Sequence, residues 1–379
     1  MEKIHDVEAL VFPSGASWLI DTVIANPMSE YLQYREKRSS WMRKMTTVIV
    51  RVQTASGRYG LGWVGGGKSA PASLIEEVFR DLLVGENPFD IEVLWERMYR
   101  ASIPYGRKGV AIEAISGIDT ALWDLLGKIT GQPVYNLLGG KTKDKLRVYA
   151  TGNAVESHLK RGFRDVKLAM VHGPADGREG MEKNEQLVRE TRERIGADGQ
   201  IMLDCYMGWN EAYTLEMAQR LKQYRIRWIE EPLMPQYYDG YRRLRELLNP
   251  MGILVSGGEH EFTRYGFREI IEKQAVDLLQ PDIGRAGGVS EVKKICTIAS
   301  AYGIPVILHG SGSPAYHVAM STPNCLCSEY IDMFAGGGTP FFSGEPQPKN
   351  GTIELSEAPG FGYELNQELL QGKEPAPIW

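Results

Sequence analysis

The sequence predicts an α/β protein in which most of the chain forms a parallel (β/α)-barrel and the first third forms a smaller α+β domain. From residue 146 onward, eight short apolar runs alternate with amphipathic segments at spacings of roughly 20 to 35 residues, which is the rhythm of βα units that close into a barrel. Before residue 66, β-branched runs separated by a glycine-containing turn predict an antiparallel meander instead.

The composition is that of an ordinary globular protein. The 379 residues are 43% hydrophobic and 24% charged, and no apolar run approaches the roughly 20 residues needed to span a bilayer. The N-terminus shows no basic region followed by an apolar stretch and a cleavage site, so we expect a cytoplasmic protein with no membrane partner. The net charge of −5, without a lysine or arginine stripe, argues against a nucleic-acid partner. The four cysteines lack zinc-type spacing and are expected to be reduced thiols.

We expect three segments along the chain. Residues 1–145 form the α+β domain, with strands in "VEALVF" and in 45–65, and with helices that stop at Gly131. Residues 146–340 form the barrel, and residues 341–379 return to turn-forming sequence that packs back on the N-terminal domain. The eight expected barrel strands are "LRVYAT", "DVKLAM", "QIMLDCY", "IRWIEEP", "GILVSGGE", "AVDLLQPDI", "PVILHG" and "SEYIDMF".

Polar side chains stand at the ends of these strands. Catalytic groups of (β/α)-barrels collect at the C-terminal ends of the strands, so the last polar residue of each run is a candidate site residue. In chain order these candidates are Lys167, Asp204, Glu230 with Glu231, Glu259, Asp282, His309 and Glu329.

Three consecutive strands end in carboxylates, namely Asp204, Glu230 and Glu259. Carboxylates crowded at one point repel each other and raise one another's pKa, so such a set is stable mainly around a divalent cation. Oxygen ligands without histidine or cysteine favour Mg²⁺ over zinc. The alternative for each residue is a structural role, as a helix cap or as the partner of a lysine.

Lys167 precedes the three acidic strands and His309 lies two strands beyond them. A cation flanked by two proton carriers suits the removal of a proton next to a carboxylate, because the cation and a lysine can hold the enediolate that forms. Asp282, one strand before His309, can bond one ring nitrogen and raise the basicity of the other. The alternative is that His309 is a structural histidine at a strand end.

These strand ends resemble those of the enolase superfamily, in its mandelate racemase subgroup. The resemblance runs over essentially the whole chain and implies a Mg²⁺-dependent enzyme with a modified (β/α)7β TIM barrel and an N-terminal α+β capping domain. It implies that Asp204, Glu230 and Glu259 bind the metal and that Asp282 with His309 is the acid/base pair, while Glu329 binds or polarises the substrate. The stretches that carry the resemblance are "SGIDTALWDLLGKITGQPVYNLLGG", "LDC", "WIEEP", "SGGEH", "QPDIG", "LHGSGS" and "APGFGYELN".

One departure from the subgroup pattern bears on the reaction. Many members carry K-x-K on the second strand, whose second lysine is a base on the face opposite the histidine, whereas this chain has Ala169 there. With Lys167 left to hold the substrate carboxylate, His309 would take the α-proton and then protonate the departing β-hydroxyl. The resemblance therefore implies dehydration of an aldonic acid to a 2-keto-3-deoxy acid, a hydro-lyase reaction of carbohydrate catabolism.

Within the subgroup, "IANPMS", "GPADG", "SGGEHE" and "GEPQPKNGTIELSEAPGFG" are most similar to L-rhamnonate dehydratases. The similarity implies that His260 and Arg38 contact the substrate, although His260 could instead cap a helix or pack, and Arg38 could be merely solvated. Those dehydratases have a histidine where this chain has Trp18, and an aromatic wall changes which hydroxyl or terminal methyl is accepted. Lyxonate, mannonate, arabinonate, xylonate, fuconate and galactonate therefore remain alternative substrates.

Two other functions remain open at this stage. A racemase or cycloisomerase of the same subgroup is disfavoured by Ala169. A non-catalytic structural homologue would be expected to lack a metal ligand or the acid/base pair, and none of these residues is missing from the sequence. The resemblance also implies a homo-oligomer.

Overall fold

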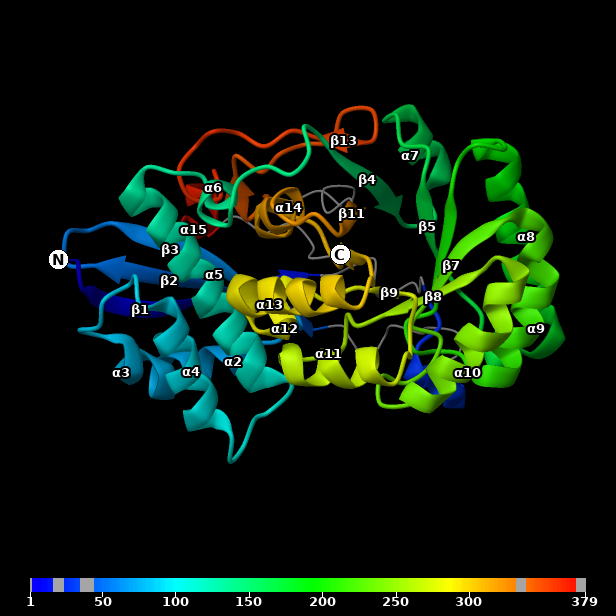
Figure 1. Cartoon of the computed structure of the whole chain (residues 1–379), viewed down its shortest axis with the longest axis horizontal. Coiled ribbons are helices and arrows are strands. Elements are labelled where there is room, and N and C mark those ends of the chain that lie inside the picture. The colour runs from blue at the N-terminus through cyan, green and yellow to red at the C-terminus, as the bar shows by residue number, and fades with distance from the viewer. Residues whose placement is uncertain (1, 16–23, 35–43, 332–338, 373–379) are drawn as a thin grey trace.

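The computed structural model describes residues 2–15, 24–34, 44–331 and 339–372. Figure 1 shows an N-terminal region of sheet and helices beside a barrel of strands with helices around it, which confirms the predicted fold class. Two of the predicted substrate contacts, Trp18 and Arg38, lie outside the described residues. None of the helices within those ranges is long and apolar enough to cross a membrane.

The N-terminal region is built on the predicted antiparallel meander. Its strands β1 (Ile4–Gly15), β2 (Lys44–Thr54) and β3 (Tyr59–Val64) pair in the order β1-β2-β3. Their buried β-branched side chains pack against the helices that follow, which gives this region an apolar core of its own. The helical elements are η1 (Pro27–Glu30), η2 (Leu32–Tyr34), α2 (Ala70–Leu74), the π-helical η4 (Ile75–Phe79), α3 (Arg80–Leu83), α4 (Ile91–Ser102), α5 (Val110–Thr130) and α6 (Val134–Leu137).

Helix α5 lies directly on the sheet because glycines remove side chains at the contact. A Cβ atom on Gly62 would lie 2.0 Å from the carbonyl oxygen of Gly117, and one on Gly60 would lie 2.1 Å from that of Ala121. The helix ends where the sequence predicts, since Gly131 takes the left-handed conformation with φ 68° that favours glycine after a helix.

The barrel closes with eight parallel strands, as predicted. Each strand pairs with the next along the chain, and β11 pairs back with β4 through Ser328 and Val148. Tyr149, Met202 and Trp228 belong to a small apolar cluster contributed by different barrel strands. The strands are β4 (Leu146–Thr151), β5 (Val166–Ala169), β6 (Ile201–Asp204), β7 (Ile226–Glu230), β8 (Leu254–Gly257), β9 (Leu278–Leu279), β10 (Val306–Leu308) and β11 (Cys325–Ile331).

Helices cover the outside of the barrel and connect its strands (Figure 1). They are α7 (Val155–Lys160), η5 (Pro174–Asp176), α8 (Gly177–Ile195), α9 (Glu211–Leu221), η6 (Lys222–Tyr224), α10 (Tyr238–Leu248), η7 (Asn249–Met251), α11 (Thr263–Glu272), α12 (Ile283–Ala286), α13 (Gly288–Ala301) and α14 (Ser313–Met320). Their amphipathic faces pack on the strands in the large core that holds the barrel together.

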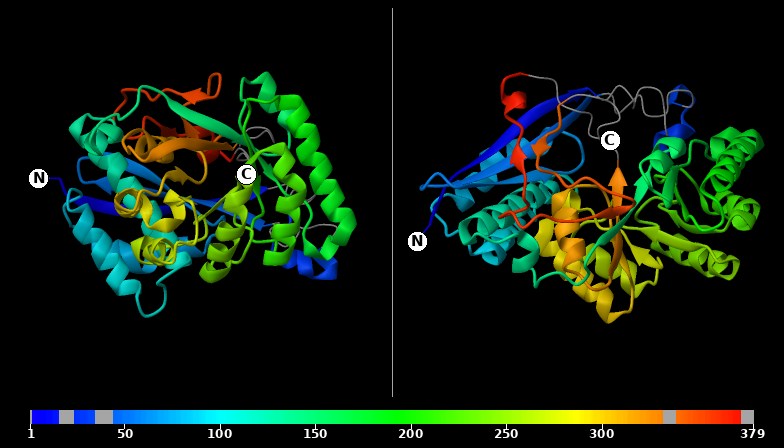
Figure 2. Two further views of the ribbon diagram at one scale, coloured as in Figure 1. Left: turned by 45° about the vertical axis from the view of Figure 1, so that its right-hand side comes forward. Right: turned by 90° about the horizontal axis from the view of Figure 1, so that it is seen from above.

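The C-terminal segment ties the two regions together (Figure 2). Strand β13 (Thr352–Ile353) pairs with β4 of the barrel, while β12 (Phe342–Ser343) pairs with β14 (Glu364–Leu365) ahead of the short helix α15 (Gln367–Leu370). The hydroxyl of Tyr363 donates to the carbonyl of Leu61 at 2.9 Å, and the amide of Phe361 donates to Asp124 of α5 at 2.9 Å. The amide of Gly65 donates to the carbonyl of Gly284 at 3.0 Å, so the end of β3 meets the barrel beside Asp282.

Candidate active site at the barrel mouth

The predicted strand-end residues lie in one buried cluster at the barrel mouth. The fold carries them there because parallel strands present their C-terminal ends on the same side of a closed barrel. Lys167, Glu230 and Glu329 are completely buried, and Glu259, Asp282 and His309 are 3%, 2% and 6% exposed. Burial of so many ionisable groups requires close pairing or bound ligands.

Lys167 lies at the centre of the acidic side of the cluster. Its Nζ is 2.5 Å from Glu230 Oε1, 2.8 Å from Glu329 Oε1 and 3.6 Å from Asp204 Oδ2. Burial lowers the pKa of Lys167, but the surrounding carboxylates outweigh it and hold the pKa well above the usual value. The predicted contact of this lysine with a substrate carboxylate stays a prediction.

Asp282 and His309 form the predicted pair. His309 Nδ1 lies 2.7 Å from Asp282 Oδ2, and His309 Nε2 faces Glu259 Oε2 at 3.3 Å and Glu329 Oε2 at 3.9 Å. Burial alone would lower the pKa of His309, yet Glu259, Asp282 and Glu329 together raise it to about 10. The imidazole is thus oriented by one carboxylate, with its second nitrogen directed into the cluster.

Asp204 and Glu230 are carboxylates of the cluster whose pKa values are raised. Burial raises the pKa of Asp204 to about 6, with Glu259 and Glu329 adding to the rise against the opposing effect of Lys167. Burial likewise raises the pKa of Glu230, which also accepts a hydrogen bond from Gln280 Nε2 at 2.5 Å. Such raised values indicate a buried site with more negative charge than its own cations offset.

The oxygen donors of Asp204, Glu230 and Glu259 therefore fit a hard divalent cation such as Mg²⁺. Within the part of the chain that the structure describes, however, the atoms gathered within 4.8 Å of one another come from Glu231, Glu259 and His260. Lys167 lies between Asp204 and Glu230 and occupies oxygens that a metal would use. Two of the predicted metal ligands, Asp204 and Glu230, thus contact Lys167, whereas Glu259 faces His309, His260 and Arg285, and the role of all three as ligands stays a prediction.

His260 forms a second imidazole–carboxylate pair in the cluster. Its Nδ1 lies 2.6 Å from Glu231 Oε2, and its Nε2 lies 3.7 Å from Glu259 Oε1. The ring of Tyr206 packs edge-on against the imidazole at a centroid distance of 5.2 Å. The ring of His260 does not cap a helix, because its Nδ1 bonds Glu231.

The sequence did not single out several residues that the fold brings to the cluster. Arg285 of α12 is 8% exposed, and its Nη2 lies 3.7 Å from Glu259 Oε1. Thr151 donates to Glu329, which also accepts from the amide of Gly310 at 2.8 Å. Thr151 ends a predicted strand and could have been found by the same strand-end rule, whereas Arg285 lies six residues beyond the end of β9, where that rule says nothing.

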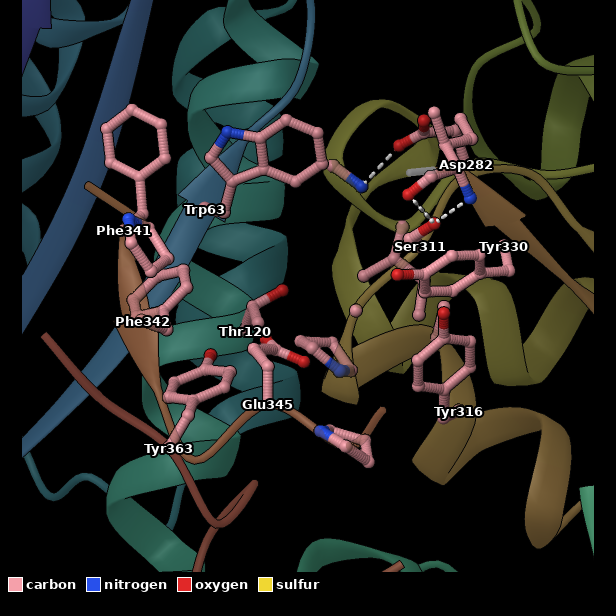
Figure 3. Close-up of a pocket in the computed structure, with 18 of the residues that line it drawn as sticks. Trp63, Thr120, Asp282, Ser311, Tyr316, Tyr330, Phe341, Phe342, Glu345 and Tyr363 are labelled. Atoms are coloured by element: carbon pink, nitrogen blue, oxygen red, sulfur yellow. Dashed lines mark hydrogen bonds between the residues drawn. The ribbon is translucent and has the colours of Figure 1, made fainter. Parts of the chain in front are cut away.

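A large pocket adjoins the Asp282 and His309 pair and encloses about 1050 Å³ of empty space, its open mouth included. Figure 3 shows aromatic side chains along two sides of it, with Glu345 between them. The metal-ligand candidates and Lys167 do not line this pocket, so it is a space beside the acidic cluster and not the cluster itself. The labelled aromatic residues are Trp63, Phe341, Phe342 and Tyr363 on one side and Tyr316 and Tyr330 on the other.

Comparison with known proteins agrees with this architecture. Residues 34–139 match the family described as mandelate racemase / muconate lactonizing enzyme, N-terminal domain, and residues 150–369 match the family described as enolase C-terminal domain-like. The first range covers β2, β3 and the helices that follow, and the second begins near the end of β4 and covers the rest of the barrel with most of the C-terminal segment.

Individual relatives match from end to end. A Caldivirga maquilingensis protein with a provisional assignment as an L-rhamnonate dehydratase is 39% identical over 97% of this chain and 96% of its own. The L-rhamnonate dehydratase of Saccharopolyspora erythraea is 38% identical over 97% of both chains. The crystal structure of rhamnonate dehydratase from Gibberella zeae complexed with Mg has a TM-score of 0.91 and 36% identity, covering 99% of this chain and 96% of that one. With both domains matched and relatives aligned over their full length, the chain belongs to the mandelate racemase and muconate lactonizing enzyme family of the enolase superfamily.

Proposed function

We propose that the protein catalyses the Mg²⁺-dependent dehydration of an aldonic acid, L-rhamnonate or a related aldonate, to the 2-keto-3-deoxy acid. The observation that carries the proposal is the buried Asp282–His309 pair, whose second ring nitrogen, Nε2, faces Glu259 and Glu329. This geometry provides an oriented proton carrier beside a set of carboxylates suited to a divalent cation.

Asp204, Glu230 and Glu259 would hold the Mg²⁺. When bound, the ion supplies positive charge that stabilises the negative charge developing on the carboxylate oxygens of the substrate. The chain itself adds the buried ammonium of Lys167, which lies within 3.6 Å of Asp204, Glu230 and Glu329. The same ammonium would offset part of the charge of a substrate carboxylate.

His309 would move the protons. A cation held by the carboxylates would offset the charge of Glu259 that raises the pKa of His309, so that Nε2 is unprotonated and can take the α-proton. Proton removal leaves the substrate as an enediolate, while Asp282 keeps Nδ1 protonated and oriented. The protonated Nε2 then donates to the β-hydroxyl as the carbon–oxygen bond breaks, so that water leaves. His309 is then neutral again, and the enol product takes up a proton at the β-carbon and releases its 2-hydroxyl proton to water, which gives the 2-keto-3-deoxy acid.

The face opposite His309 favours dehydration over racemisation. Ala169 stands two residues beyond Lys167 on β5, and the alternation of side chains on a strand directs both to the barrel interior. The side chain of Asn153 brackets the backbone of Ala169, donating to its carbonyl at 3.0 Å and accepting from its amide at 2.9 Å. A methyl group cannot carry a proton, so only one face of the α-carbon is served at this position.

The substrate is proposed on the names of the relatives and the site chemistry. Relatives named L-rhamnonate dehydratase match the whole chain, and the buried cluster offers both cationic and imidazole partners for a polyhydroxy acid. Trp18, Arg38 and His260 are the predicted determinants of which aldonate is accepted. Because Trp18 replaces an expected histidine, the related aldonates stay within the proposal.

A substrate screen tests the proposal. Chelator-treated protein is incubated with L-rhamnonate, lyxonate, mannonate, arabinonate, xylonate, fuconate and galactonate, with and without Mg²⁺, and the 2-keto-3-deoxy product is measured. We expect turnover of at least one aldonate only when Mg²⁺ is present. In D₂O, unreacted substrate should not return as its C2 epimer, because Ala169 leaves one face without a base. Epimer formation without keto acid would favour a racemase, and no product from any aldonate would contradict the dehydratase.

A further inference from the structure

The barrel mouth carries two imidazole–carboxylate pairs that converge on one side chain. His309 and His260 each hold a carboxylate at Nδ1, at 2.7 Å and 2.6 Å, and each directs Nε2 toward Glu259, at 3.3 Å and 3.7 Å. The first pair is the proposed proton carrier. The carboxylate of the second pair, Glu231, has no part in the proposed reaction.

Glu231 holds His260 by both its ring and its backbone. Oε2 bonds the ring at Nδ1, whereas Oε1 accepts from the amide of Gly258 at 3.1 Å and from the amide of His260 at 3.2 Å. Glu231 is only 2% exposed, and the edge-on ring of Tyr206 closes a further side of the imidazole. These contacts leave His260 one orientation, with Nε2 facing the cluster.

The backbone at Glu231 is bent to make this possible. Glu231 follows the last residue of β7, so regular strand alternation would direct its side chain away from Glu230 and out of the barrel. Its φ of 39° is in the left-handed region, which is strained for a residue with a Cβ. A strained backbone that turns a buried carboxylate onto a histidine ring indicates a functional contact.

We propose that Glu231 is a positioning residue that fixes the tautomer of His260, so that Nε2 accepts a hydrogen bond from a substrate hydroxyl. A carboxylate only accepts hydrogen bonds, so Nδ1 carries a proton, and in the neutral ring Nε2 then presents its lone pair. A polyhydroxy acid supplies hydroxyl donors for that lone pair. This inference rests on the proposed dehydration and adds Glu231 as a determinant of how the acid sugar is held.

The variant Glu231→Gln inverts this hydrogen bond with little change of shape. Because Oε1 serves two backbone amides, the amide oxygen of glutamine is expected to keep that place and to leave its NH₂ group against Nδ1. Nδ1 must then accept, so the ring proton moves to Nε2, which becomes a donor. We expect KM to rise about 10–100-fold with kcat changed only a few-fold, since His309 is untouched.

Glu261→Gln is the matched control. Glu261 is 2% exposed and only one residue beyond His260, but its partners are Lys108 and Tyr238 away from the cluster. Its variant should leave KM near the wild-type value. Glu231→Asp, which keeps a carboxylate, should restore part of the loss, and Glu231→Gln in a His260→Phe background should raise KM no further.

The tautomer is read directly from the ring ¹⁵N resonances of histidine-labelled protein without substrate, with His260→Phe identifying the signals. We expect Nδ1–H in the wild type and Nε2–H in Glu231→Gln, with Mg²⁺ affinity by calorimetry unchanged within a few-fold. The same tautomer in both proteins, an unchanged KM, or additive effects with His260→Phe would each overturn the inference. Because the resonances need no turnover, a tautomer switch in a protein that dehydrates no aldonate would contradict the proposed function and leave the role of Glu231 standing.

Discussion

Asp282 combines a structural role with its proposed catalytic role in one side chain. Its Oδ1 accepts from the amide of Gly284 at 2.6 Å and caps α12, while its Oδ2 holds His309. Burial raises the pKa of Asp282, but the hydrogen bond and charge of His309 outweigh it and leave the pKa below its usual value. The helix cap therefore fixes the carboxylate that in turn fixes the imidazole.

Replacement of His309 tests the proton carrier. His309→Asn keeps a hydrogen-bonding group of similar size near Asp282 but cannot accept the α-proton, so we expect kcat to fall by about 10²–10⁴-fold. Mg²⁺ affinity should stay within a few-fold of the wild type, because the three carboxylates remain. Steady-state kinetics and calorimetry measure the two quantities, and near-normal dehydration by this variant would contradict the assignment.

Replacement of Glu259 tests the metal ligands. Glu259→Gln removes one charge from a site whose remaining carboxylates contact Lys167, so we expect Mg²⁺ binding to weaken about 100-fold or more, and activity with it. Glu261→Gln is again the control, because that carboxylate is buried nearby and directed elsewhere. Chelator-treated protein that works equally well without added Mg²⁺ would remove the argument for a metal.

At the scale of elements, glycines decide how closely the N-terminal helix and sheet approach. Strand β3 carries Gly60 and Gly62 where α5 crosses it, and an added Cβ at either position would meet backbone atoms of the helix. Backbone cannot move aside as a flexible side chain can, so the whole helix would have to shift. The position of α5 matters for the site because the same sheet reaches the barrel at Gly65 and Gly284.

Two glycine variants separate steric contact from backbone conformation. Gly62→Ala should destabilise the protein by about 3 kcal/mol or more, because the new methyl group falls 2.0 Å from the Gly117 carbonyl oxygen. Gly131→Ala should cost only about 1 kcal/mol, because its surroundings are open and only its left-handed φ is disfavoured. Chemical denaturation measures the free energy of unfolding of both variants. An equal loss of stability in the two would show that the contact of β3 with α5 is not tight.

At the scale of the whole molecule, the C-terminal segment connects the N-terminal region to the barrel. His317 of α14 lies at this junction, where its Nδ1 accepts from the amide of Tyr135 at 3.2 Å and its ring packs on those of Tyr135 and Phe361. Burial, with Lys141 as a second contribution, lowers the pKa of His317 to about 3. The folded protein thus keeps this imidazole neutral over the ordinary pH range.

Acid should therefore weaken the junction through His317. A folded pKa below the unfolded value near 6.5 means that unfolding takes up a proton, so this stabilisation is complete above about pH 6.5 and is lost as the pH falls toward 3. Between pH 7.5 and pH 5 the loss is about 2 kcal/mol. His317→Asn, whose side-chain oxygen can still accept from Tyr135, should lose about 2 kcal/mol less stability than the wild type over that range. If the free energy of unfolding fell by the same amount in both proteins between pH 7.5 and pH 5, this account would be contradicted.

The sequence by itself determined the barrel, the meander before it and most of the buried cluster. Alternating apolar runs and helical segments depend on local periodicity, and the strand-end rule places Lys167, Asp204, Glu230, Asp282 and His309 together once a barrel is assumed. The contacts between them follow from closure, because β11 must pair with β4 before the first and last strands share a mouth.

Only the tertiary structure decided what Glu231 contacts and which further groups join the site. Strand periodicity directs Glu231 outward, whereas a left-handed backbone angle turns it onto His260. Arg285 reaches Glu259 from a short helix, and the aromatic pocket is assembled from the N-terminal sheet, the barrel and the C-terminal segment. No local pattern encodes such contacts, since they depend on a single backbone angle or on segments hundreds of residues apart in the chain.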